Sequence, residues 1–179
     1  AGVCQAVGTC RVGLLPLALL RRLCRKPTMP QSLSWTRTGA ILAGLAVVCG
    51  AFAAHGLNTH FADIYAGQTR VVAGVTVPLA EKYLEDFKTG AEYQMYHSLA
   101  LLAVGLVATM RPSRSLNWAG WSFLGGIVLF SGSLYALTLL NQPKLGMITP
   151  IGGVLFLVGW GFLAHATCPR CAPASSPAP

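Results

Sequence analysis

LNWAGWSFLGGIVLFSGSLYALTLL, the stretch from Leu116 to Leu140, runs for 25 residues without a charged side chain. About 20 mostly apolar residues are enough for a helix to cross the hydrocarbon core of a bilayer. The apolar residues follow one another continuously instead of alternating with polar ones, which favours a helix over the strand of an outer-membrane barrel. We therefore predict a membrane-spanning helix here, closed by the turn residues that lead to Pro143.

Three other stretches have the same character, and none of them contains Lys, Arg, Asp or Glu. They are Thr38 to Leu57, Tyr93 to Met110 and Gly146 to Ala166. The loops after the second and third spans are short, whereas the first loop, from Asn58 to Glu92, is long. The sequence thus predicts an all-α fold, an integral membrane four-helix bundle with a longer first extramembrane loop. We expect this membrane domain to cover residues 35–166, between disordered tails at 1–34 and 167–179.

The composition of the chain agrees with a membrane location. Hydrophobic residues make up 54% of the 179 residues and charged residues only 10%, against about 25% charged residues in a typical soluble domain. The net charge of +8 is unevenly placed, because all five acidic residues lie between Asp63 and Glu92 and six basic residues precede the first span. A basic segment beside an apolar span is typical of the positive-inside pattern, so we expect no nucleic-acid partner.

Four spans place both termini on the same side of the membrane. With the N-terminus inside, nine Lys and Arg lie inside (six in the N-terminal tail, two in the second loop and Arg170) and four outside (three in the first loop and Lys144). This count predicts a multi-pass protein of the plasma (inner) membrane with both termini cytoplasmic. Residues 1–28 are rich in Arg and lack acids, which makes a mitochondrial membrane the alternative. The compact start at Met29 also suggests that residues 1–28 are an extension upstream of the folded unit.

The long first loop contains two expected elements of its own. Thr69 to Pro78 reads TRVVAGVTVP, two β-branched runs around a small turn, which predicts a hairpin. Leu79 to Thr89 places apolar side chains four residues apart with acids between them. That spacing predicts an amphipathic helix lying at the membrane interface and leading into the second span.

Polar residues within the spans gather toward the membrane face that carries the first loop. Up-and-down threading brings the end of the first span, the start of the second and the later half of the third to that face. Polar groups at membrane depth usually face the bundle interior, so the cluster is either a set of interhelical hydrogen bonds or a ligand, ion or proton site. The candidate polar cluster consists of His55, Glu92, Tyr93, Gln94, Tyr96, His97, Ser131 and Ser133.

No catalytic residue is predicted. Glu92 and His97 are five positions apart and diverge around a helix, so they do not form an acid–base pair. Cys168 and Cys171 form a CxxC pair in the C-terminal tail, a weak metal candidate because two further ligands are missing at a recognisable spacing. We therefore expect no cofactor, no metal and no enzymatic activity.

Small residues recur at four-residue spacing along the spans. Examples are Ala40 with Gly44 and Ser122 with Gly126, and the fourth span adds Gly152 and Gly159. Small residues let helix backbones approach closely in lipid. They predict either tight packing inside the bundle or a seam between copies of the chain.

Four phrases of the sequence, in this order, carry a family resemblance. They are GAFAAHGL from Gly50, FKTG with YQMYH ending at His97, GIVLFSGSLY from Gly126, and ITPIGG from Ile148. From Thr36 to Ala166 the chain resembles the domain of unknown function 423 family of small four-helix membrane proteins. In that family, bacterial members are inner-membrane proteins and a vertebrate relative is called transmembrane protein 256. The resemblance implies the four-helix architecture and no mechanism, and the first loop around Gly67 to Pro78 is longer than the family pattern.

Two functional hypotheses follow. The first is a multi-pass membrane protein of unknown biochemical activity that serves as a structural or accessory membrane component. Its partners would be the lipid bilayer and either further copies of itself or another membrane protein. The alternative is a small oligomeric transporter or channel subunit with a polar site near His55 and His97. A polar, water-accessible cavity around these two histidines would favour the alternative.

Overall fold

The computed structural model describes residues 31–168, which form four long helices and one β-hairpin. The first helix, α2 (Gln31–Phe52), continues through a π-helical turn (Ala53–Leu57) into α3 (Asn58–Ile64). Strands β1 (Thr69–Val72) and β2 (Val75–Pro78) form the hairpin, which leads into α4 (Leu79–Met110). The remaining elements are α5 (Arg114–Gly126), a second π-helical turn (Ile127–Ser131), α6 (Gly132–Leu139), a 3-10 turn (Pro143–Met147) and α7 (Thr149–Thr167).

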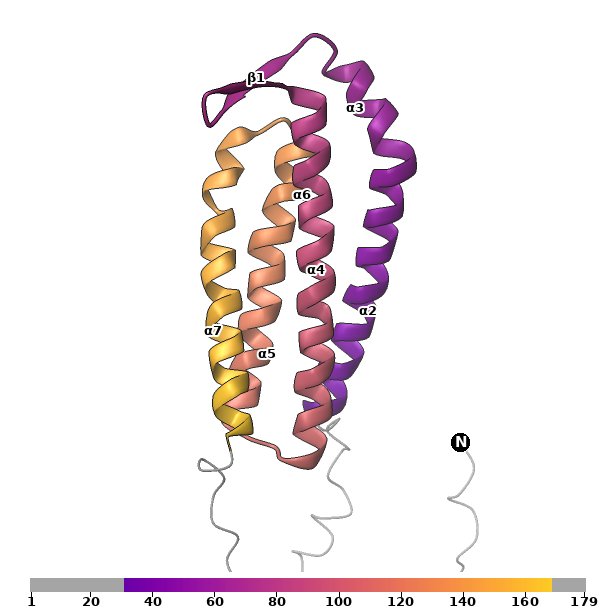
Figure 1. The fold of residues 1–179 in the computed structure, drawn as a ribbon. Coiled ribbons are helices and arrows are strands. Elements are labelled where there is room, and N and C mark those ends of the chain that lie inside the picture. Colours follow the sequence, from indigo (N-terminus) through magenta and orange to yellow (C-terminus); the bar gives the residue numbers. More distant parts are fainter. Residues whose placement is uncertain (1–30, 169–179) are drawn as a thin grey trace, which may run out of the picture.

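All four long helices have the length and apolar composition needed to cross a membrane. Each predicted span coincides with one of them, the third running one residue past its helix end at Leu139, so the predicted all-α membrane bundle is confirmed. The helices stand side by side, with α4 between α2 on one side and α7 on the other (Figure 1). The four helices are Ser34–Ile64, Leu79–Met110, Arg114–Leu139 and Pro143–Thr167.

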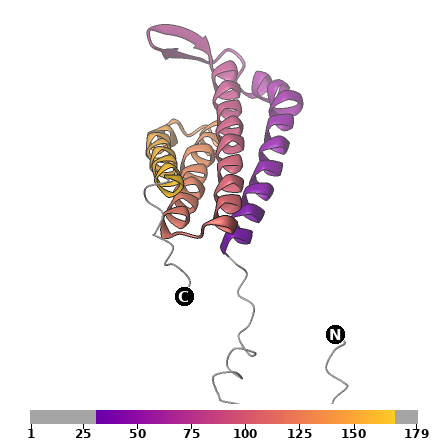
Figure 2. The ribbon, with the colours of Figure 1, turned by 60° about the horizontal axis from the view of Figure 1, so that its bottom comes forward.

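The start of α2 and the end of α7 lie at one end of the bundle, and the hairpin lies at the other (Figures 1 and 2). We call these the terminus end and the hairpin end. The helical part runs from Gln31 to Thr167, slightly beyond the predicted domain of residues 35–166. The tail residues 1–30 and 169–179 lie outside the described residues, so their predicted disorder stays a prediction.

The helix that contains the second span is longer than predicted, because α4 is one continuous helix of 32 residues. The amphipathic helix predicted from Leu79 to Thr89 is the first third of α4 and leads into the second span without a break, and its position at the membrane interface stays a prediction. Tyr83, Phe87 and Gly90 are buried along one face that runs on into the apolar part, so nothing bends the helix between them. All charges of α4 lie within its first 14 residues, up to Glu92. At 1.5 Å per residue, that segment is about 21 Å long.

The predicted start of the first loop at Asn58 was also wrong. The apolar face of α2 continues through Ala53, Leu57 and Phe61, all buried at a spacing of four residues, and the helix therefore extends to Ile64. The predicted hairpin is confirmed, with Val72 opposite Val75. Ala73 and Gly74 make the two-residue turn with φ of 49° and 83°, the left-handed conformation that such turns require.

Two buried cores stabilise the bundle, one toward each end. The terminus-end core packs Trp35 of α2 against Leu101 and Val104 of α4 and against Leu116 and Phe123 of α5. The hairpin-end core is rich in aromatic rings. We call its four rings, Phe61, Tyr65, Tyr83 and Phe87, the aromatic cap.

The small residues divide between the interior and the surface of the bundle. A Cβ added to Gly39 would lie 2.7 Å from the carbonyl oxygen of Ser98, and one added to Gly152 would lie 2.5 Å from the backbone nitrogen of Phe130. These two positions therefore require glycine for close helix contact. Ala40 and Gly44, in contrast, are exposed on α2, and a Cβ on Gly44 would meet nothing within 4 Å.

Candidate functional site

Gln94 is the most extensively bonded polar side chain of the predicted cluster. It is buried on α4. Its amide nitrogen donates to the carbonyl oxygen of Leu42 on α2 at 2.9 Å, and its amide oxygen accepts from the Tyr135 hydroxyl of α6 at 3.0 Å. The side chain thus ties three helices together with both ends of its amide group.

His97, one turn further along α4, is equally satisfied. Its Nδ1 lies 2.8 Å from the carbonyl oxygen of Tyr93. A carbonyl only accepts, so Nδ1 carries the proton and Nε2 is left to accept from the indole N–H of Trp160 at 3.4 Å. The imidazole also stacks on Phe156, with ring centroids 3.4 Å apart and planes 5° from parallel. Both nitrogens and one face of the ring are therefore occupied by the protein.

The two serines of the cluster have different environments. Ser133 donates to the carbonyl oxygen of Phe130, so its oxygen accepts from the Thr149 hydroxyl of α7 at 2.8 Å. Ser131 is fully buried in the second π-helical turn, and its hydroxyl has no hydrogen-bond partner among residues 31–168. The first is an interhelical link, and the second is an unsatisfied group in the described part of the chain.

The structure does not bring the other predicted members into this interior. His55 and Glu92 are exposed on the bundle surface, and Tyr96 is 55% exposed. Tyr93 is partly exposed and stacks on Phe130 with centroids 4.5 Å apart. Of the eight predicted residues, Gln94, His97, Ser131 and Ser133 are buried and the other four face outward.

His55 and His97 do not share a site. Gln94 contacts Leu42, and His55 lies 13 residues beyond Leu42, which is about 20 Å along a helix axis. His97 lies one turn away from Gln94 in the opposite direction, because α2 and α4 are antiparallel. The two histidines are therefore too far apart to form the single polar site that the sequence predicted.

Three of the partners were absent from the predicted cluster. Tyr135, Trp160 and Thr149 each bond a buried member of it. They all lie in the predicted spans. A polar atom on an otherwise apolar helix was the feature of the sequence that could have identified them as members of the cluster. Which of them meet depends on helix neighbours and rotations, which a single sequence does not contain.

Two tyrosines tie the aromatic cap to α6 and to the turn that follows it. The Tyr65 hydroxyl donates to the carbonyl oxygen of Thr138 at 3.1 Å, and the Tyr83 hydroxyl donates to Oδ1 of Asn141 at 2.8 Å. Burial, and secondarily the neighbouring Tyr83, raises the pKa of the Tyr65 phenol above its ordinary value. The neutral hydroxyl that serves as the donor is therefore favoured.

The described part of the chain contains one of the two cysteines of the predicted metal candidate. Within residues 31–168, no group of three His, Cys, Asp or Glu side chains comes together to hold a metal ion. Cys168, which directly follows α7, is half-buried, whereas Cys171 lies outside the described residues. The CxxC pair thus stays an untested candidate.

Comparisons with known proteins agree with the fold. The model of a family described as "Protein of unknown function (DUF423)" matches residues 49–153. A UPF0382 membrane protein of Staphylococcus epidermidis is 45% identical over 129 residues, 72% of this chain and 90% of that protein. The UPF0382 membrane protein YwdK of Bacillus subtilis is 43% identical over 123 residues, 68% of this chain and 85% of that protein. No solved structure matches the chain significantly.

Proposed function

The chain belongs to the DUF423 family of membrane proteins, and on that premise we propose that it acts as a non-catalytic structural or accessory component of the membrane. That it is a multi-pass membrane protein follows from its four apolar helices and from its relatives. The observation that carries the accessory role is the complete use of His97 and Gln94 by other protein groups. Buried side chains whose polar atoms are each bonded to other protein groups serve as ties between helices, which supports a structural role over a ligand site.

We also propose an orientation, with both termini cytoplasmic in a plasma (inner) membrane. Its main support is the basic N-terminal tail. Without the tails, three basic residues lie at the terminus end (Arg37, Arg111 and Arg114) and four at the hairpin end (Arg70, Lys82, Lys88 and Lys144). The relatives named above come from bacteria, which fits this membrane better than a mitochondrial one.

The partners of an accessory component would meet it within the bilayer. The outward side of α2 is apolar, with Ile41, Leu45 and Val48 each at least half exposed. In the membrane this side contacts lipid, and it is the surface on which another membrane protein or a second copy would pack.

The accessory role is tested by proton flux and stability in the same variants. The full-length protein is reconstituted into liposomes under a pH gradient, with a pH-sensitive dye inside. We expect no flux above that of empty liposomes, and no change in flux for His97→Ala. In detergent, His97→Ala should lower the melting temperature, because interhelical hydrogen bonds of this kind contribute roughly 0.6–2 kcal/mol.

The matched control is His55→Ala, which removes an imidazole from the surface of the first π-helical turn. It should leave the melting temperature unchanged. A proton flux that disappears in His97→Ala while the melting temperature stays constant would replace the accessory role with the transport alternative.

A further inference from the structure

An open cleft of about 640 Å³ lies beneath the hairpin, at the hairpin end of the bundle. Strand β1 contributes Arg70 to its lining, and the hairpin lies at the same end of the bundle as the turn between α6 and α7 (Figure 1). Its lining comes from β1, α4, the second π-helical turn, α6, the 3-10 turn and α7. The residues that matter here are Arg70, Lys82, Asp86, Phe130, Leu134 and Met147. Its volume is within the range of small-molecule sites, about 300–1,000 Å³.

The lining changes from charged to apolar along the bundle axis. Lys82 and Asp86 lie in the charged first part of α4. Phe130, at the lower side of the cleft, stacks on Tyr93, the residue that directly follows the last charge of α4. The cleft therefore extends from the level of the lipid headgroups to the border of the hydrocarbon. An occupant needs a charged end and an apolar end in that order.

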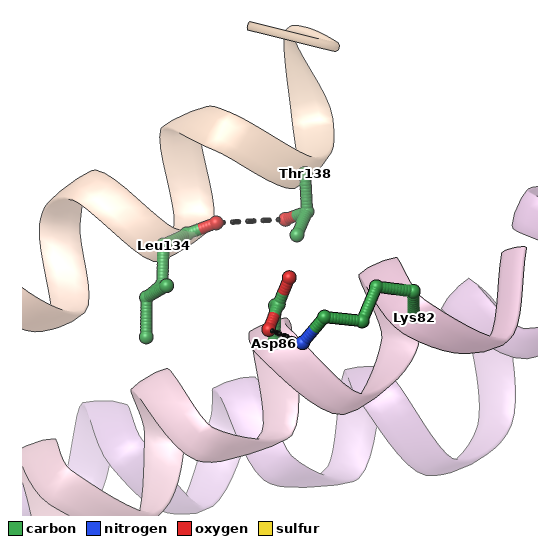
Figure 3. Close-up of polar contacts among 4 residues, drawn as sticks. All are labelled: Lys82, Asp86, Leu134 and Thr138. Carbon is green, nitrogen blue, oxygen red and sulfur yellow. Dashed lines mark hydrogen bonds and ion pairs between the residues drawn. The ribbon is translucent and has the colours of Figure 1, made fainter. Parts of the chain in front are cut away.

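The charges of the cleft do not cancel. Lys82 and Asp86 form an ion pair one turn apart on α4, drawn in Figure 3. The nearby Thr138 hydroxyl donates to the carbonyl oxygen of Leu134 and not to Asp86, whose carboxylate pairs with Lys82 (Figure 3). Arg70 on β1 is exposed and makes no ion pair with any residue that the structure describes. One positive charge is thus unmatched at the headgroup level.

We propose that this cleft binds one anionic phospholipid. Its phosphate lies between Arg70 and Lys82, and an acyl chain runs down along Met147, Leu134 and Phe130. A guanidinium and an ammonium are both strong partners for phosphate oxygens. Free phosphate carries the same charged oxygens but has no acyl chain to contact the apolar side of the cleft. The lipid site does not depend on the accessory role, because none of its residues belongs to the Gln94 and His97 ties.

The test measures lipid binding to the full-length protein in detergent, by native mass spectrometry and by thermal shift. The probes are phosphatidylglycerol, phosphatidylcholine and inorganic phosphate. We expect one phosphatidylglycerol to bind more tightly than phosphatidylcholine, and inorganic phosphate to leave the melting temperature unchanged. Arg70→Gln should weaken phosphatidylglycerol binding about tenfold, the effect of losing one charge-assisted hydrogen bond, and Arg70→Lys should retain most of it.

Two further variants separate a specific site from general attraction to a basic protein. Lys144→Gln removes a charge at the same end without touching the cleft, and binding should stay unchanged. Asp86→Asn frees Lys82 from its ion pair, so phosphatidylglycerol should bind more tightly. Equal losses in Arg70→Gln and Lys144→Gln, weaker binding in Asp86→Asn, or an equal thermal shift with inorganic phosphate would each overturn the proposal.

Discussion

At the residue scale, the interior of the bundle is organised by a few polar side chains that have no alternative partner in lipid. Gln94 shows this most clearly, since Leu42 and Tyr135 satisfy opposite ends of its amide. In water, either group could exchange its partner for solvent. At membrane depth an unsatisfied group costs more, so the rotation of α4 relative to α2 and α6 is fixed by this amide.

A double-mutant cycle tests the pairing of Gln94 with Tyr135. Gln94→Met and Tyr135→Phe should each destabilise the protein in detergent, and the double variant should lose less than the sum of the two. The coupling expected for such a bond is about 0.6 kcal/mol, with an upper range near 1.7 kcal/mol. The control cycle pairs Gln94→Met with Ser133→Ala, which shares no contact with it and should be additive. Additivity in the first cycle would show that the bond does not couple the helices.

Tyr65 should give the aromatic cap a dependence on pH. Because the folded pKa is raised above the unfolded value of about 10, its contribution is complete below pH 10 and is lost as the pH rises through the folded pKa. Tyr65→Phe removes the bond to Thr138 and should cost about 0.5–1.5 kcal/mol at neutral pH. The difference in melting temperature between wild type and variant should shrink above pH 10. A difference that stays constant up to pH 11 would contradict the role of the neutral hydroxyl.

At the scale of elements, the helices are held by close backbone contacts at some glycines and not at others. Gly39 of α2 contacts the backbone of α4 at Ser98 and Leu102, whereas Gly44 of the same helix faces outward. The four-residue spacing of small residues does not distinguish these cases. The rotation of α2 relative to α4 decides which of these glycines faces the neighbouring helix.

Gly39→Ala and Gly44→Ala form a matched pair on this helix. The first places a methyl group 2.7 Å from a carbonyl oxygen and should destabilise the bundle by about 1–3 kcal/mol. The second meets no neighbour, so it should be neutral or should stabilise the helix by up to about 1 kcal/mol, because alanine is the better helix former. Thermal unfolding in detergent measures both. A loss in Gly44→Ala comparable to that in Gly39→Ala would indicate that the outer face of α2 is packed against a second copy.

The spans and the hairpin could be predicted because their signals are local: absence of charge over a helix length, and two β-branched runs around Ala73 and Gly74. The outward direction of the His55 side chain could not be predicted. Ala53 and Leu57 face α4, and His55 lies two positions from each, about 200° around the helix. Only the identity of the neighbouring helix settles which side is inside. The unbroken α4 was missed for a related reason, since charge ends an apolar span but does not end a helix.

At the scale of the whole molecule, the two ends of the bundle differ in charge. Every acidic residue of the chain lies at the hairpin end, from Asp63 to Glu92. The terminus end carries Arg37, Arg111 and Arg114, and the part of the sequence that precedes α2 is also basic. This asymmetry is the basis for the proposed orientation.

Reporter fusions test the orientation directly. Fusions after Arg114 and after Ala166 should both report the cytoplasm, because both positions lie at the terminus end. Deleting residues 1–28 removes five of the nine basic residues counted inside. If those charges set the orientation, the truncated chain should show a mixed signal at both fusion points. An extracytoplasmic signal from the full-length fusions would reverse the assignment.

The continuous α4 also determines which bilayer suits the protein. Between Glu92 and Arg111 it has 18 uncharged residues, a hydrophobic length of about 27 Å. That length matches a thin bilayer and falls short of thick, sterol-rich membranes of about 32–33 Å. Tilting only shortens the reach of a helix, so a thicker bilayer must thin around the protein or draw Glu92 inward. Each ångström of that mismatch costs a fraction of a kcal/mol, so a bilayer near 27 Å suits α4 better than a thick, sterol-rich one.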